Sequence, residues 1–339
     1  MDITRHLISK ENLSSLIGKC LEDGKKVYAP VKKNNLVNFA FISSFQEITN
    51  DYINTVQSAK PVLFPKAEKL MEIKMSKDNI ELKSRDKNLI SETIVYGSRP
   101  CDATGINILN KMFTAGITDQ LFAERFAKTT VVSVSCNKCD SKCFCTSMGI
   151  NPGNTEGSDI LLTEVENGNY LVEVITEKGQ KIISAYQSYF DKAPDINKDK
   201  YLVDVPVAFE LKGFDEKIKD AFDSPIWLEQ SMRCIGCGSC AYACPTCACF
   251  DIQDSFNGQE GQRKRNWDSC GFSMFTLHSS GHNPREVQSK RWRQRILHKF
   301  YYMPEQFQLF GCTGCGRCSR SCPTDMNIKD HLINLIKNI

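Results

Sequence analysis

Two cysteine runs with identical spacing constrain this 339-residue chain more than any other feature of its sequence. Each run reads C-x2-C-x2-C-x3-C-P, the spacing that binds 4Fe-4S clusters in bacterial ferredoxins. The short spacers let one tight loop supply three thiolates, and the glycines within each run let the backbone wrap closely around a cluster. The cysteines are Cys234, Cys237, Cys240 and Cys244 in the first run, and Cys312, Cys315, Cys318 and Cys322 in the second.

The two runs are one motif used twice, because each cysteine of the second follows its counterpart in the first at a constant interval. In two-cluster ferredoxins the fourth cysteine of each run ligates the cluster of the other run. We therefore predict two 4Fe-4S clusters whose fourth ligands are exchanged. The first is predicted on Cys234, Cys237, Cys240 and Cys322, and the second on Cys312, Cys315, Cys318 and Cys244.

Zinc is the alternative metal, since zinc sites also use C-x2-C pairs. A zinc ribbon needs two such pairs and has no use for the third cysteine and the Cys-Pro of each run. Iron–sulfur clusters are therefore favoured. A zinc-stabilised nucleic-acid-binding protein is the alternative from another functional class.

Composition is that of a soluble globular protein with about two domains. The chain is 41% hydrophobic and 24% charged, and single cores seldom grow beyond about 250–300 residues. A net charge of +3 indicates no strong attraction to nucleic acid. The N-terminus lacks an apolar signal region and no run of 18 apolar residues occurs, so we expect a cytoplasmic protein without a membrane segment.

Cysteine usage indicates a reducing compartment. The 17 cysteines are odd in number and concentrated in metal-type spacings, which argues against a disulfide scaffold. We expect an anaerobic cytoplasm.

The N-terminal part is predicted to be an α+β or α/β domain over residues 1–215. Stretches 89–96 and 129–135 are rich in β-branched residues, and each leads into a loop that carries cysteine. From residue 160 onward we expect an antiparallel meander, with a further short strand after residue 180.

Residues 216–339 are predicted to form an α-helical ferredoxin-type domain with two clusters. The runs are farther apart than in a compact bacterial ferredoxin, and the segment between them does not look strand-like. Residues 285–302 have a dense helical composition.

A third metal site is predicted in the N-terminal domain. Loops at the carboxyl ends of parallel strands meet at one edge of a sheet, which would bring the cysteines of two such loops together. Cys139 is a substitute ligand, and free thiols or a zinc site are the alternatives. The four cysteines assigned to this site are Cys101, Cys136, Cys143 and Cys145.

Three further cysteines, Cys247, Cys249 and Cys270, have two interpretations. A free cysteine often packs as a small buried hydrophobe, so they are expected to line the cluster pocket. Further ligation is the alternative.

Basic residues gather in the segments 263–265, 290–295 and 298–299. They suit a solvated helix face, a nucleic-acid patch, or a positive surround that lowers the cost of adding an electron to an anionic cluster and docks an acidic redox partner. No G-x-G-x-x-G or G-x-x-x-x-G-K-[ST] motif marks a nucleotide site, and no catalytic site is evident.

Several motifs together resemble the family that holds the electron-transfer subunit of anaerobic sulfite reductase and the beta subunit of cytoplasmic sulfhydrogenases. The stretches that carry the resemblance are Gly97–Asp102, Cys143–Gly149, Arg233–Cys240, Cys244–Cys249, Arg263–Cys270 and Gly311–Pro323.

The resemblance implies a protein that relays electrons between a flavin subunit, which oxidises NAD(P)H, and a terminal subunit. That terminal subunit is a siroheme sulfite reductase in one branch and a nickel–iron hydrogenase in the other. We expect the sulfite reductase branch, with the hydrogenase branch as the alternative. A stand-alone enzyme with its own substrate pocket is a further alternative.

Overall fold

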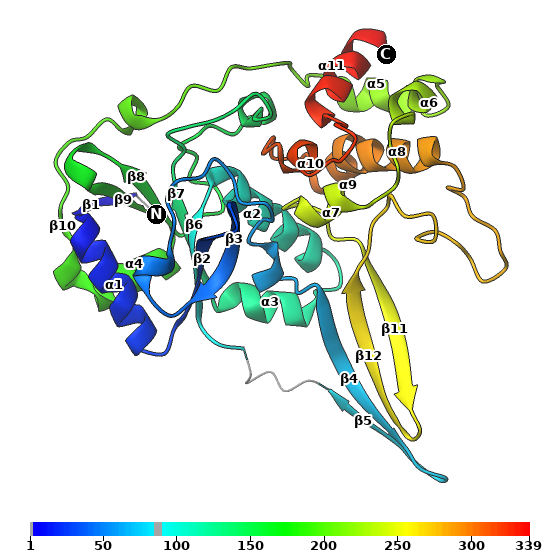
Figure 1. Ribbon diagram of the computed structural model, residues 1–339, viewed down its shortest axis with the longest axis horizontal. Coiled ribbons are helices and arrows are strands. Elements are labelled where there is room, and N and C mark those ends of the chain that lie inside the picture. Colours follow the sequence, from blue (N-terminus) through cyan, green and yellow to red (C-terminus); the bar gives the residue numbers. More distant parts are fainter. Residues whose placement is uncertain (1–2, 85–89) are drawn as a thin grey trace.

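A mixed eight-stranded sheet organises the N-terminal part of the molecule (Figure 1). The computed structural model describes residues 3–84 and 90–339, and the strand order of this sheet is β10-β1-β9-β8-β7-β6-β2-β3. The parallel strands at its centre are β2 (Lys26–Lys33), β6 (Thr93–Ser98), β7 (Thr129–Val134) and β8 (Ile160–Glu164). The antiparallel strands at its sides are β3 (Leu36–Ile42), β9 (Tyr170–Val174), β1 (Thr4–Ile8) and β10 (Asp191–Lys192).

Helices cover both faces of this sheet, which explains why β6 and β9 are buried along their whole length. On one face α1 (Lys10–Glu22) and α4 (Glu177–Ala185) pack against the aliphatic side chains of the strands. On the other face α2 (Pro100–Thr114) and α3 (Gln120–Ala127) share a core with the aromatic ring of Trp267. The mixed α/β character predicted for the N-terminal part is confirmed.

Two local predictions in this part need correction. Residues after Glu177 form the helix α4 instead of a strand, because the Thr176 hydroxyl accepts a hydrogen bond from the Gly179 amide and caps the first turn. The strand expected over 89–96 begins at Thr93, and Leu89 lies outside the described residues.

The C-terminal part is built from short helices around the two cysteine runs (Figure 1). Its core joins Trp227, Trp292, Phe300 and Leu332, which come from three separate helical segments. The helical composition noted over 285–302 is confirmed, because α8 continues through a π-helical turn at His298–Tyr302 into α9. The helices are α5 (Phe214–Asp220), α6 (Ile226–Ser231), α7 (Ser239–Ala243), α8 (Gln288–Leu297), α9 (Met303–Phe307), α10 (Arg317–Arg320) and α11 (Ile328–Asn338).

A second sheet projects from the body as an arm (Figure 1). Its strand order is β11-β12-β4-β5, and every neighbouring pair is antiparallel. Two strands come from each side of residue 215, so this sheet crosses the boundary predicted between the domains. The strands are β4 (Ala67–Met75), β5 (Ile80–Ser84), β11 (Phe250–Asn257) and β12 (Glu260–Trp267).

The hairpin β11–β12 corrects the prediction that the segment between the cysteine runs is not strand-like. Gly258 takes a φ of +60° in the two-residue loop, a conformation that glycine adopts without strain and that favours a tight hairpin. A purely α-helical description of the C-terminal domain is therefore not confirmed. Among the described residues, no helix has the length and apolar character needed to cross a bilayer.

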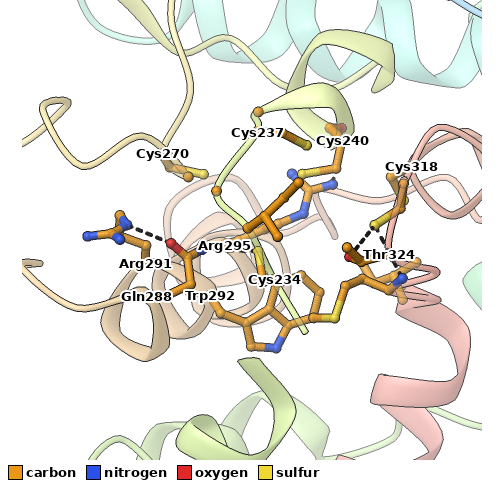
Figure 2. A pocket seen from close by; sticks show the side chains of 17 residues that line it. Cys234, Cys237, Cys240, Cys270, Gln288, Arg291, Trp292, Arg295, Cys318 and Thr324 are labelled. Atoms are coloured by element: carbon orange, nitrogen blue, oxygen red, sulfur yellow. Dashed lines mark hydrogen bonds between the residues drawn. The ribbon is translucent and has the colours of Figure 1, made fainter. Parts of the chain in front are cut away.

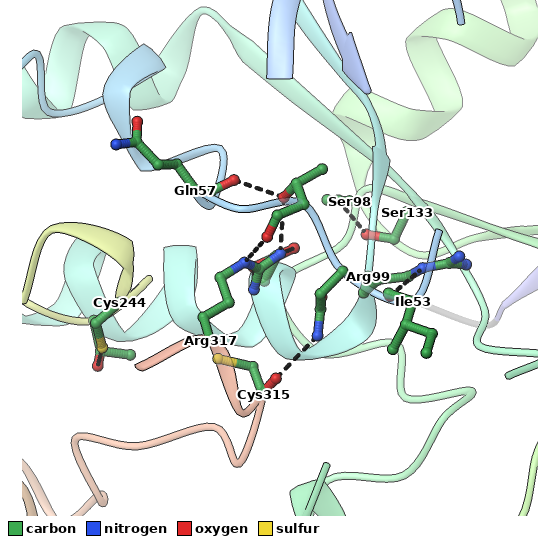
Figure 3. A network of polar contacts seen from close by, with 12 residues as sticks. Ile53, Gln57, Ser98, Arg99, Ser133, Cys244, Cys315 and Arg317 are labelled. Atoms are coloured by element: carbon green, nitrogen blue, oxygen red, sulfur yellow. Dashed lines mark hydrogen bonds and ion pairs between the residues drawn. The ribbon is translucent and has the colours of Figure 1, made fainter. Parts of the chain in front are cut away.

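The two parts of the chain are joined by a buried ion pair. Arg317, in the second cysteine run, donates two hydrogen bonds to the carboxylate of Asp102 in α2, at 2.5 and 2.7 Å. Both side chains are almost fully buried, and the guanidinium also reaches the carbonyl and hydroxyl oxygens of Thr55 (Figure 3). Because one guanidinium of the cluster loop satisfies groups from two segments of the sheet domain, it fixes how that loop sits on the domain.

Replacing Asp102 by alanine should leave the Arg317 guanidinium buried without its carboxylate partner. Removing one partner of a buried pair costs about 3–5 kcal/mol, so we expect the free energy of unfolding to fall by about that amount. Anaerobic urea denaturation measures it. Asp325→Ala is the matched control, because its pair with Lys142 joins the same two parts but is exposed and should contribute little. Equal losses in the two variants would contradict the role given to the buried pair.

Candidate iron–sulfur centres

The three cysteines at the start of the first run line one pocket, together with residues of α8 and the start of α11 (Figure 2). Two cysteines of the second run, Cys318 and Cys322, line the same pocket. Its walls include the apolar side chains of Trp292, Met326 and Ile328. The structure therefore brings Cys322 to the first run, although it is far from that run in the sequence.

Hydrogen-bond donors are directed at sulfur in this pocket. The Met326 amide donates to Cys322 Sγ at 3.2 Å, and the side-chain amide of Gln288 donates to Cys234 Sγ at 3.1 Å. Burial opposes ionisation of Cys322, but the hydrogen bonds from Thr324 and Met326 outweigh it and lower the pKa of this thiol. Such donors stabilise a thiolate, which is the form of cysteine that binds metal.

Cys244 lies with the second run. The Lys299 ammonium contacts Cys244 Sγ at 3.4 Å and the carbonyl of Gly311, the residue before Cys312, at 2.6 Å. The Thr246 hydroxyl links the same two segments through a 2.7 Å hydrogen bond to Gly311. The structure thus brings the fourth cysteine of the first run to the beginning of the second.

Both runs hold their cysteines in the same backbone conformation. Each contains C-x-G-C-G-x-C, and its glycines take positive φ, with values of +69° and +73° at Gly236 and Gly238 and +63° and +72° at Gly314 and Gly316. These angles are accessible to glycine and rarely to other residues, so the glycines let each short loop turn its three sulfurs inward.

The chemistry of the sulfur donors fits a cluster. Burial raises the pKa of the Cys312 thiol to about 12 and that of Cys318 to about 11. These sulfurs become thiolates only when a metal replaces their protons, so cluster binding must release protons and stabilise the fold.

Three of the N-terminal cysteines lie in the loop after β7. Burial, together with the neighbouring thiols of Cys136 and Cys143, raises the pKa of Cys145 to about 12. Cys101 lies in the first turn of α2 and is buried, which raises the pKa of its thiol, and the nearby thiols of Cys136 and Cys315 raise that pKa further. Cys139 is more exposed and donates to the Asp204 carbonyl at 3.6 Å.

This N-terminal cysteine loop packs directly on the second run. The Phe144 amide donates to the Gly314 carbonyl at 2.9 Å, and a Cβ at Gly314 would lie 2.5 Å from the Phe144 carbonyl oxygen. Arg320 reaches from α10 to Cys143 Sγ at 3.2 Å and to the Asp140 carboxylate. The three groups of cysteines therefore follow one another in space, with the second run in the middle.

The remaining cysteines of the C-terminal part also lie near the runs. Cys247 is hydrogen-bonded to Cys244, Cys249 is hydrogen-bonded to Cys270, and Cys270 lines the first pocket. Of these three cysteines, Cys270 is the one that lines the first pocket, and the role of the other two stays a prediction. Within residues 3–84 and 90–339, no three His, Cys, Asp or Glu side chains are grouped closely enough to hold a single metal ion.

The basic stretch near residue 295 is only partly a solvated face. Arg295 and Lys299 are buried and point at the cysteine loops, whereas Lys290 is exposed and pairs with Glu286. Sequence reasoning missed one further buried cation, Lys60, whose ammonium donates to the Cys247 carbonyl at 2.9 Å. No periodic pattern or motif surrounds Lys60, so only its tertiary contacts identify it.

Comparisons with known proteins agree with this geometry. A family model described as a 4Fe-4S dicluster domain matches residues 233–326, the region that contains both cysteine runs. The beta subunit of sulfhydrogenase 2 from Pyrococcus furiosus is 30% identical over 317 residues, which cover 89% of this chain and 90% of that protein.

The similarity extends well beyond the ferredoxin-type runs, since it covers the sheet domain and the N-terminal cysteine loop as well. Similarity over the dicluster region alone would indicate only a cluster-binding module. The chain belongs to the family of 4Fe-4S dicluster electron-transfer subunits that includes the sulfhydrogenase beta subunits.

Proposed function

We propose that the chain is the electron-relay subunit of a cytoplasmic anaerobic oxidoreductase complex, placed between a flavin subunit that oxidises NAD(P)H and a terminal reductase or hydrogenase. The observation that carries this proposal is the close succession of three cysteine groups through the molecule. When bound, 4Fe-4S clusters take up and give off single electrons. The chain itself would hold the sulfur ligands and present Cys237, an exposed cysteine, to a partner.

The proposed ligand sets follow the exchange of fourth cysteines. The presence of Cys322 in the first pocket supports the first set, and the contacts of Lys299 with Cys244 and Gly311 support the second. The first cluster is assigned to Cys234, Cys237, Cys240 and Cys322, and the second to Cys312, Cys315, Cys318 and Cys244.

A third cluster is proposed at the N-terminal cysteines. The proximity of Cys101 to both Cys136 and Cys315 supports it, because a cluster at this position would extend the relay from the second run toward a partner. The assigned ligands are Cys101, Cys136, Cys143 and Cys145, with Cys139 as the substitute.

Two terminal enzymes are candidates. The motifs that the chain shares with the electron-transfer subunit of anaerobic sulfite reductase favour a siroheme sulfite reductase. The match to a sulfhydrogenase beta subunit favours a nickel–iron hydrogenase. No specific contact in the described residues favours a nucleic-acid partner.

The complex isolated anaerobically from the native host through a tag on this chain should oxidise NAD(P)H and contain flavin. Siroheme absorption with NAD(P)H-dependent sulfite reduction would identify the first branch, and nickel with hydrogen evolution the second. A tagged chain that carries clusters but binds neither a flavin protein nor a terminal enzyme would contradict the relay proposal.

The exchange of fourth ligands is tested by comparing serine variants. Cys244→Ser should alter the same electron paramagnetic resonance signal that Cys315→Ser alters, because both residues are assigned to the second cluster. Cys237→Ser should alter the other signal. If Cys244→Ser instead reproduces the spectrum of Cys237→Ser, the exchange is wrong and each run binds its own cluster.

The third site is tested by iron and sulfide analysis. Two 4Fe-4S clusters require about eight irons and three require about twelve, so we expect about twelve in the reconstituted protein and about eight in Cys101→Ala. Cys20→Ala is the matched control, since this buried cysteine of α1 lies in the sheet core away from the cysteine loops. About eight irons in the unaltered protein would remove the third site.

A further inference from the structure

Three cations are buried around the loop that joins Cys240 to Cys247. Lys60, Arg295 and Lys299 are 2%, 4% and 3% exposed. In the part of the chain that the structure describes, their polar contacts are to sulfur, hydroxyl and carbonyl oxygen, and none is to a carboxylate. The positive charges are therefore not neutralised by acidic side chains.

Three other buried cations have a carboxylate partner, whereas buried Arg99 donates to the backbone carbonyls of residues 52, 53 and 135. Arg317 pairs with Asp102, and both Arg125 and Arg265 pair with Glu68. Burying a charge without a counter-charge is costly, so an unpaired group of three cations indicates that another anion belongs beside them. Thiolate-ligated iron–sulfur clusters carry net negative charge and would supply it.

The internal repeat shows which of these cations distinguishes the two clusters. Each fourth cysteine is followed by Pro-Thr, and the threonine hydroxyl contacts its sulfur, at 3.1 Å for Cys244 and 3.4 Å for Cys322. The equivalence ends at the next contact. Cys244 receives the Lys299 ammonium, whereas Cys322 receives the neutral backbone amide of Met326.

Arg295 does not separate the two sites in this way. Its guanidinium contacts the carbonyl of Cys240 at 3.2 Å and Cys247 Sγ at 3.6 Å, and it lines the first pocket as well. The Lys60 ammonium contacts the Cys247 carbonyl and the ring of Trp267 instead of a cysteine sulfur. Lys299 is thus the one of the three whose ammonium contacts a proposed ligand sulfur of the second cluster.

We propose that Lys299 makes the cluster of the second run easier to reduce than it would otherwise be. An electron that enters the two clusters would then reside mainly on the cluster of the second run, which lies beside the N-terminal cysteine loop. Reduction adds one negative charge, and a fixed cation near the ligand sulfur stabilises that charge. This inference rests on the ligand sets given under the proposed function. Lys299 acts as a positioning residue, since it contacts a ligand and the electron itself passes through the cluster.

The test is a redox titration of the reconstituted chain, followed by electron paramagnetic resonance so that the two signals are resolved. In Lys299→Gln, which keeps a hydrogen-bond donor but loses the charge, we expect the reduced-to-oxidised ratio of the second cluster to fall at least tenfold at a fixed potential. For one electron this is a shift of about 59 mV to lower potential. Lys299→Arg, which keeps the charge, should bring the midpoint potential of the second cluster most of the way back to that of the unaltered protein.

Lys290→Gln is the matched control, because it removes an exposed charge from the same helical segment and should leave both midpoints unchanged. A midpoint of the second cluster that is unchanged in Lys299→Gln, or lowered equally in Lys290→Gln, would overturn the proposal. Selective loss of the second cluster in Lys299→Gln, with retention in Lys299→Arg, would support it. Equal loss in both variants would assign Lys299 a packing role and overturn it.

The iron analysis separates this inference from the proposed function. If the unaltered chain binds no iron–sulfur cluster, the proposed function fails and the inference fails with it. If both clusters assemble and their midpoints do not respond to Lys299, only the inference fails.

Discussion

The buried ion pair between Arg317 and Asp102 fixes the position of the second cysteine run on the sheet domain. Arg317 lies between two proposed cluster ligands, Cys315 and Cys318. Its contact with Asp102 therefore holds the loop that carries both cysteines. The same guanidinium holds Thr55, and Asn54 beside it donates to the Cys315 carbonyl at 3.0 Å (Figure 3). Held in this way, the second run packs against the N-terminal cysteine loop, where the Phe144 amide donates to the Gly314 carbonyl.

The sheet end that receives the loop is itself fixed by a buried arginine. Arg99, between β6 and α2, donates to the carbonyls of Tyr52, Ile53 and Ser135, so it ties two adjacent strand ends to the segment that Arg317 holds. These hydrogen bonds satisfy backbone oxygens that would otherwise be buried without partners. The result is a continuous polar layer between the sheet and the cluster loop, which suits a protein whose cofactors must keep constant separations.

The cysteine loops and much of the N-terminal fold were predictable from sequence because they depend on short-range patterns. A run of four cysteines acts through one loop, and the glycines at its turns are visible in the sequence. The helix α4 was missed because Gly179 indicated a turn, whereas Thr176 caps a helix there. The arm was missed for a different reason, since β4 and β12 pair across almost two hundred positions of sequence and neither is strongly periodic.

The unneutralised cations illustrate the same limit. Arg295 and Lys299 looked like part of one basic surface, and only the packing of α8 and the π-helical turn shows that they are buried. Lys60 comes from a stretch with no recognisable pattern, so its role depends on tertiary contacts alone. Their common environment indicates that the C-terminal part is built around an anionic cofactor.

Metal analysis combined with visible spectroscopy of the anaerobically purified chain tests this central conclusion most directly. We predict a brown protein that contains iron and acid-labile sulfide, with broad visible absorption that bleaches when dithionite is added. A colourless protein that is fully folded and holds stoichiometric zinc would contradict it.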